Sequence, residues 1–144
     1  AIRIAEREPA AIVQSSKARY LLDDQAQVLS LVEDTQYSDL PILRGVSSTF
    51  PTVRDPEGQQ KIRDGIQVGH LLARAFNEVP TVNVEQASMI VASIKALRFQ
   101  FGESIEAQWQ RFQTLSPSIQ EHMTREATEV DLRYAGKVIL RKRE

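Results

Sequence analysis

Few side chains in this sequence are suited to acid–base, nucleophilic or metal chemistry. His70 and His122 are the only histidines, and both lie among polar or helical neighbours, where a surface or packing role is expected. The chain has no cysteine, no His-x-His or His-Glu-x-x-His pair, no Walker motif and no Gly-x-Gly-x-x-Gly sequence. We therefore expect no catalytic residue, no cofactor and no metal site, and a protein that is not an enzyme.

One pair of adjacent carboxylates, Asp23 and Asp24, resembles an acid–base pair in composition only. It lies in the polar segment Asp23-Asp24-Gln25-Ala26, between two short apolar runs. Aspartates in such a position accept hydrogen bonds from nearby backbone N–H groups and form turns. We expect a hairpin turn here.

The stretch most indicative of function is residues 129–144. It reads as two strands of alternating apolar residues folded over a Tyr-Ala-Gly turn, and it ends in the basic residues Arg141, Lys142 and Arg143. A terminal strand is expected at a sheet edge, where its unpaired backbone groups can accept a strand from another protein. The basic residues would protect the edge from aggregation, pair with acidic residues of a partner, or contact anionic lipid.

The bulk composition limits the alternatives. The chain has 144 residues, enough for one domain, and 18 basic against 19 acidic side chains give a net charge of −1. No global field therefore attracts nucleic acid or an anionic bilayer. Nothing in it resembles a signal peptide or a spanning helix, so we expect the soluble part of any membrane-anchored parent protein.

The first part of the chain predicts short strands. Alternation predicts a strand over residues 1–8, interrupted by Pro9, and further strands follow at 10–14, 20–22 and 28–31. Residues 33–38 are polar and predict a loop. Residues 40–45 are short and contain a proline, which predicts an edge or connecting segment.

The second part predicts helices packed on more strands. Asp55-Pro56 is a helix start, and an apolar stripe continues to Phe76; Gly65 and Gly69 within it indicate close packing on a sheet. Strands are expected at 82–85, 89–94 and 97–101. Ser104 is expected to cap a second helix with an apolar stripe at Ile105, Trp109, Phe112 and Leu115, ended by Ser116-Pro117. Core packing of that stripe is favoured over an exposed groove-binding face, and residues 118–128 stay ambiguous.

The predicted fold class is therefore α+β. A mainly antiparallel, twisted sheet carries one covering helix and a second short helix, within a single domain spanning residues 1–144.

Four segments, in order, resemble the C-terminal β domain of the FtsQ/DivIB family of bacterial cell-division proteins. They are Glu6-Arg7-Glu8-Pro9-Ala10, Tyr20-Leu21-Leu22-Asp23-Asp24, Leu40-Pro41-Ile42-Leu43-Arg44-Gly45 and Val130-Asp131-Leu132-Arg133-Tyr134. The resemblance covers nearly the whole chain, and residues 1–9 resemble the last strand of a preceding POTRA domain. The chain departs from the family at Ala26 and at Lys95-Ala96, turns where the family often has glycine.

The resemblance implies a noncatalytic scaffold of the divisome. It would lie on the extracytoplasmic side of the bacterial cytoplasmic membrane, at the division septum, with its parent protein anchored in the inner membrane by a helix absent from this chain. Its partners would be FtsB/FtsL-type division proteins. No nucleic acid is expected.

We expect the partner to bind by β-augmentation at the closing strands. The predicted partner-binding residues are Arg133, Tyr134, Gly136, Lys137, Val138 and Leu140. The alternative is another cell-envelope module, such as a peptidoglycan-binding or outer-membrane assembly domain.

Overall fold

A computed structural model describes residues 8–33, 37, 39–52, 55–115, 117, 121, 127–134 and 136–142. Two helices and nine strands are found in this part of the chain. Their bounds are β1 Ala11–Gln14, β2 Arg19–Leu22, β3 Val28–Val32, β4 Ile42–Arg44, α1 Pro56–Phe76, β5 Thr81–Asn83, β6 Ile90–Ile94, β7 Leu97–Phe101, α2 Ile105–Gln113, β8 Thr128–Asp131 and β9 Ile139–Lys142. Neither helix is long and apolar enough to cross a membrane.

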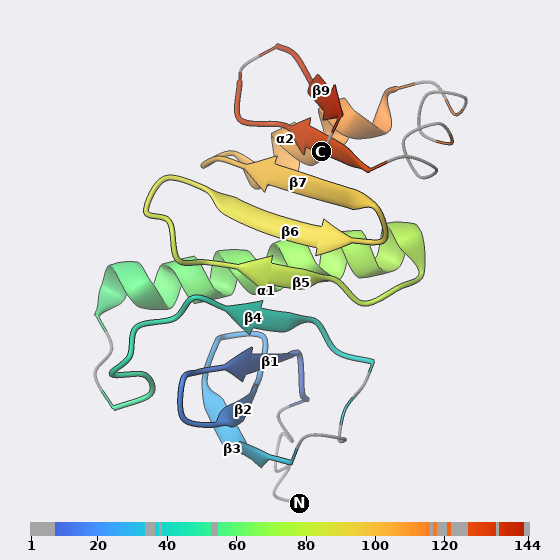
Figure 1. Cartoon of the computed structure of the whole chain (residues 1–144). Helices are drawn as coiled ribbons and strands as arrows, with labels where there is room; N and C mark the ends of the chain where they lie inside the picture. The colour runs from blue at the N-terminus through green and yellow to red at the C-terminus, as the bar shows by residue number, and fades with distance from the viewer. Residues whose placement is uncertain are drawn as a thin grey trace, which may run out of the picture.

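The strands form one sheet in the order β3-β2-β1-β4-β5-β6-β7-β8-β9. Five neighbouring pairs are antiparallel and three are parallel. Both helices lie behind the sheet in Figure 1, on the same face. The predicted α+β class, with a mainly antiparallel sheet and a covering helix, is confirmed.

The long helix α1 forms where the sequence predicts it. The Asp55 carboxylate accepts a hydrogen bond from the Gly58 N–H at 2.5 Å, and Pro56 occupies the first turn, which needs no donor there. Its two predicted close contacts are also found: a Cβ at Gly65 or Gly69 would lie 2.7 Å from a side-chain carbon of the sheet layer. Alanine at either position would force the helix away from the sheet.

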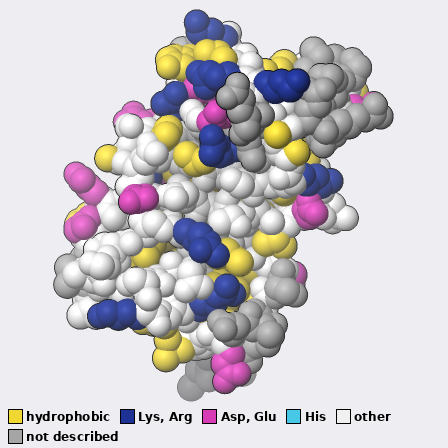
Figure 2. Space-filling view, viewed as in Figure 1, with side chains coloured by type: hydrophobic (Ala, Val, Ile, Leu, Met, Phe, Trp, Pro, Cys, Tyr) yellow, Lys and Arg dark blue, Asp and Glu magenta, His cyan; other side chains and the backbone are white. Residues whose placement is uncertain are grey.

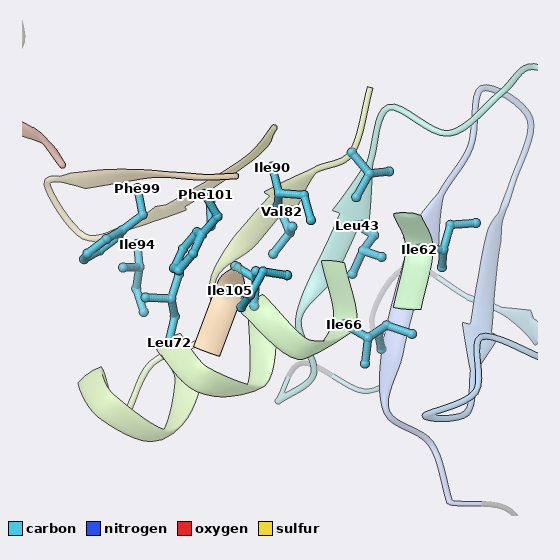
Figure 3. Close-up of a cluster of buried hydrophobic side chains, with 14 of the residues drawn as sticks. Leu43, Ile62, Ile66, Leu72, Val82, Ile90, Ile94, Phe99, Phe101 and Ile105 are labelled. Atoms are coloured by element: carbon cyan, nitrogen blue, oxygen red, sulfur yellow. The ribbon is translucent and has the colours of Figure 1, made fainter. Parts of the chain in front are cut away.

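The core lies between this face of the sheet and the two helices. Figure 3 shows side chains of the central strands, Leu43 and Val82 among them, pointing toward Ile66 and Leu72 of α1. The apolar stripe of α2 is buried as predicted, because Trp109 is 4% exposed and stacks on Phe112 with ring centroids 5.1 Å apart. The stripe is part of the core.

Two local predictions are wrong. Residues 40–45 predict an edge or connecting segment, yet they contain β4, which lies inside the sheet, parallel to β1 and to β5. Pro41 precedes the strand and contributes only its carbonyl, which accepts from the Ile12 N–H at 2.9 Å, so the missing donor costs nothing. Ser104 precedes α2 without capping it through its side chain; the Gln108 side chain instead accepts from the Gly102 N–H at 2.9 Å.

Asp23 and His70 have the structural roles that the sequence analysis predicts for them. Asp23 is buried, and its carboxylate accepts hydrogen bonds at 2.9 Å from the N–H groups of Gln25 and Gln27. His70 is exposed, with Nε2 2.8 Å from a backbone carbonyl oxygen. The expected strand at 1–8, apart from Glu8, lies outside the described residues, as do His122 and most of the ambiguous segment.

Candidate partner-binding edge

The last two strands form one end of the sheet. β8 runs parallel to β7 and antiparallel to β9, and β9 is the final strand in the order. The predicted edge position of the terminal strand is therefore confirmed. The loop between the strands is longer than the expected Tyr-Ala-Gly turn, because pairing stops where Asp131 faces Ile139.

A local hydrogen bond explains why β8 ends early. The Asp131 carboxylate accepts from the backbone N–H of Arg133 at 3.0 Å. This side-chain contact takes up the Arg133 N–H, which would otherwise point toward β9, so pairing with β9 stops at Asp131. Lys137 and Val138 consequently lie in the loop and not in the strand.

The backbone of β8 fixes which groups of β9 are free. The N–H groups of Thr128 and Leu132 donate toward the β7 side at 3.0 and 2.9 Å. Since N–H and C=O groups of successive strand residues point in opposite directions, those of Glu129 and Asp131 point toward β9.

The register then assigns the outer edge. Ile139 and Arg141 lie opposite these two residues, so their backbone groups point inward to β8. Leu140 and Lys142 alternate with them, and their backbone groups point out of the sheet. These two residues supply the donors and acceptors that an added strand would meet.

An aromatic side chain lies in the loop between β8 and the edge strand β9. Tyr134 is 45% exposed, with the guanidinium carbon of Arg133 5.5 Å from its ring centroid and Lys137 Nζ at 5.9 Å. Arg111 of α2 donates from Nη1 to the Tyr134 carbonyl at 2.9 Å, which attaches the loop to the helix. The structure thus brings Arg133, Tyr134 and Lys137, three of the predicted partner-binding residues, close together.

The other three predicted residues have different positions. Gly136 has a φ of +76°, and nothing lies within 4 Å of where a Cβ would be, so the position requires glycine for its backbone conformation and not for space. Val138 is half-buried and packs against the core. Leu140 is 42% exposed on the outermost strand.

An ionic cluster covers the face of β8 opposite the helices. Asp131 is fully buried, and its carboxylate accepts from Arg133 Nε and Nη2 at 2.9 and 2.8 Å and from Arg141 Nη2 at 3.3 Å. The hydrogen bond from the Arg133 side chain is the main cause that holds the pKa of Asp131 at about 2. Beside it, Glu129 pairs with Arg98 at 3.5 Å.

The six predicted partner-binding residues do not include Asp131, Arg111 or Arg141, although Arg141 belongs to the basic group that the sequence analysis considers for pairing with a partner. Asp131 and Arg133 are two residues apart at the end of a strand, a spacing that places both on one face, and this signal was available in the sequence. Arg111 could not be assigned, because its contact with the loop depends on how α2 packs. Figure 2 shows Lys and Arg side chains gathered at the β8–β9 end, with hydrophobic side chains between them.

A cavity of about 480 Å³ lies elsewhere, where α1 begins beside the ends of β4 and β5. Phe50, Ile62 and Val84 supply apolar lining, and among the described residues Lys61 is the basic side chain of its wall. The Lys61 ammonium donates to a backbone carbonyl at 3.2 Å, and burial lowers its pKa. None of the six predicted partner-binding residues lines this cavity, and the described residues contain no group of acidic, His or Cys side chains that would hold a metal.

No protein-family model matches this chain. A search of curated proteins likewise returned no significant match.

Proposed function

We propose that this chain is a noncatalytic docking domain of the FtsQ/DivIB kind, which binds FtsB/FtsL-type division proteins by β-augmentation at β9. The observation that carries the proposal is the outer edge of β9, which no strand of the described residues pairs, together with an exposed tyrosine and basic side chains in the loop that joins β8 to it. An exposed edge supplies backbone affinity, and the neighbouring side chains supply selectivity.

The backbone supports the resemblance at the two positions where the residue types depart from it. Ala26 and Lys95 have φ angles of 64° and 53°, in the left-handed region that glycine adopts without strain. The family often has glycine at these turns, so the departure is one of residue type and not of backbone shape. This agreement strengthens the motif-based argument.

Docking would use both faces of the added strand. On the helix side, an apolar partner residue would pack on Leu140; on the opposite side, an acidic residue would meet Arg141. Tyr134 would serve as the aromatic anchor beside the edge. The preferred partner segment is therefore an extended one in which apolar and acidic residues alternate.

The same proposal places the domain on the extracytoplasmic side of the bacterial cytoplasmic membrane, at the division septum. Its role there is to hold division proteins together, with membrane attachment supplied by a part of the parent protein outside this chain.

Tyr134→Ala tests the proposal against a matched control. Tyr134 and Tyr37 are 45% and 42% exposed, and Tyr37 follows β3 at the opposite edge of the sheet. In titration calorimetry with soluble FtsB/FtsL ectodomains, Tyr134→Ala should lose about 2 kcal/mol or more, close to thirtyfold in Kd, as interface anchors do. Tyr37→Ala should bind like the wild type.

Three results would contradict the proposal. Wild-type protein that does not bind the ectodomains would exclude the partner. Capture by purified peptidoglycan in their place would support the other envelope module. Equal affinity of both tyrosine variants would exclude Tyr134 as an anchor.

A further inference from the structure

Asp131 stands next to the proposed docking edge but has no exposed surface. Its side chain is 0% accessible, while Arg133 and Arg141, the two arginines bound to it, are 33% and 45% exposed. A partner cannot touch this carboxylate. Any influence of Asp131 on docking must therefore pass through the groups that it holds.

The two arginines belong to different parts of the docking surface. Arg133 is in the loop after β8 and lies over the Tyr134 ring, whereas Arg141 is in the edge strand β9. Asp131 Oδ1 and Oδ2 bind the Nε and Nη2 groups of Arg133, and Oδ2 also accepts from Arg141. One carboxylate thus fixes the loop and the strand relative to each other.

The cluster also keeps a positive charge directed outward. Two guanidinium groups share one carboxylate, which leaves an excess of one positive charge. The Nη1 of Arg133 has a methionine sulfur at 3.5 Å as its contact, a weak acceptor that a partner carboxylate would readily displace. Because Asp131 already holds both arginine side chains, they lose less side-chain entropy on binding a partner than freely rotating arginines would.

We propose that Asp131 is a positioning residue, which prepares Arg133 and Arg141 for an acidic partner strand without contacting it. This inference rests on the proposed function, since it requires a docked partner. A carboxylate that only fastened the loop would contribute to folding stability and leave affinity unchanged once the protein is folded.

Glu129 provides a matched control. It lies on the same strand and the same face, two residues before Asp131. Its carboxylate accepts a hydrogen bond from Gln100 Nε2 and pairs with Arg98, whereas the hydrogen bonds of Arg133 and Arg141 go to Asp131. Asp131→Asn and Glu129→Gln each replace a carboxylate by its isosteric amide. The comparison separates loss of one negative charge from loss of this particular arrangement.

The experiment is titration calorimetry of the folded variants with soluble FtsB/FtsL ectodomains. Asp131→Asn should weaken binding by about tenfold or more, while Glu129→Gln stays within about twofold of the wild type. In protein already carrying Arg133→Gln and Arg141→Gln, adding Asp131→Asn should cost less than about twofold, because the arginines through which it acts are gone. A merely structural role would not produce this non-additivity.

Wild-type affinity in folded Asp131→Asn would overturn the positioning role and leave the docking proposal standing. An equal loss in both arginine backgrounds would also overturn it. Absence of binding by the wild type would instead refute the docking proposal and the positioning role with it. If Asp131→Asn does not fold, Asp131→Glu keeps the charge, displaces it by one methylene, and must show the same loss of affinity.

Discussion

Proline at Leu140 should weaken docking strongly and leave the domain folded, whereas proline at Ile139 should destabilise the domain itself. The register of β9 assigns the Ile139 N–H to the β8 side and the Leu140 N–H to the outer edge. Proline removes the donor in either case. The two variants therefore remove hydrogen bonds to different recipients, one inside the molecule and one in the partner.

The two proline substitutions should lower the stability of the domain by different amounts. Ile139→Pro removes an inter-strand bond and leaves a carbonyl acceptor of β8 unpaired, which together cost about 2–4 kcal/mol. For a domain of this size that lowers Tm by about 6–12 °C. Leu140→Pro loses a donor that water already satisfies, at a residue 42% exposed, so its cost to stability is less than about 1 kcal/mol.

The substitution that costs less stability, Leu140→Pro, should have the larger effect on affinity for the partner. Leu140→Pro removes a ladder donor and places its ring in the path of the added strand, so affinity for the ectodomains should fall by about thirtyfold or more. Leu140→Ala keeps the N–H group and shows how much of that loss belongs to the side chain. Thermal melting and calorimetry on the same samples provide both measurements. Wild-type affinity in folded Leu140→Pro would refute β-augmentation at this edge.

Three further changes test other parts of the structure. Trp109→Ala should cost about 3–5 kcal/mol in urea unfolding, because the indole is buried against three phenylalanine rings; an unchanged midpoint would refute its core position. The folded-state pKa of Asp131, about 2, lies below its ordinary 3.8, so its stabilisation is complete above about pH 5 and is lost as the pH falls toward 2. The stability difference between wild type and Asp131→Asn should shrink by about 2 kcal/mol over that interval, and a constant difference would exclude the ion pairs as its source. Val130→Cys with Leu140→Cys should form a disulfide across a non-hydrogen-bonded pair, in a chain without other cysteines. The oxidised protein should dock within about threefold of the reduced protein; loss of docking on oxidation would mean that the partner displaces β9.

Local signals were enough to predict several elements. Asp55-Pro56 marks the start of α1 through a side-chain hydrogen bond and a missing donor, both properties of adjacent residues. The alternation of Leu97, Phe99 and Phe101 likewise predicts β7 with its correct bounds. Such features depend on backbone geometry over a few residues, so the sequence displays them directly.

The position of a strand in the sheet is not a local property. The segment Ile42–Arg44 has the short, proline-preceded pattern of an edge, but α1 returns the chain so that β5 pairs with one side of β4 while β1 pairs with the other. The predicted edge position of β9 is confirmed, because β8 pairs with one side of it and no strand of the described residues pairs with the other. The alternation of residues indicates which side chains share a face of the sheet, but it does not determine which strand lies next to which.

The candidate site also combines features that the sequence predicts with features that depend on the fold. The sequence by itself determined that residues 129–144 combine strand-like alternation with a tyrosine and basic residues, since residue type and period are local properties. Only the tertiary structure decided that Val138 turns to the core, that Leu140 faces outward, and that Asp131 binds two arginines. Ion pairs between a loop and an edge strand form only after β8 and β9 pair in one register, and that register is set by contacts distant in sequence.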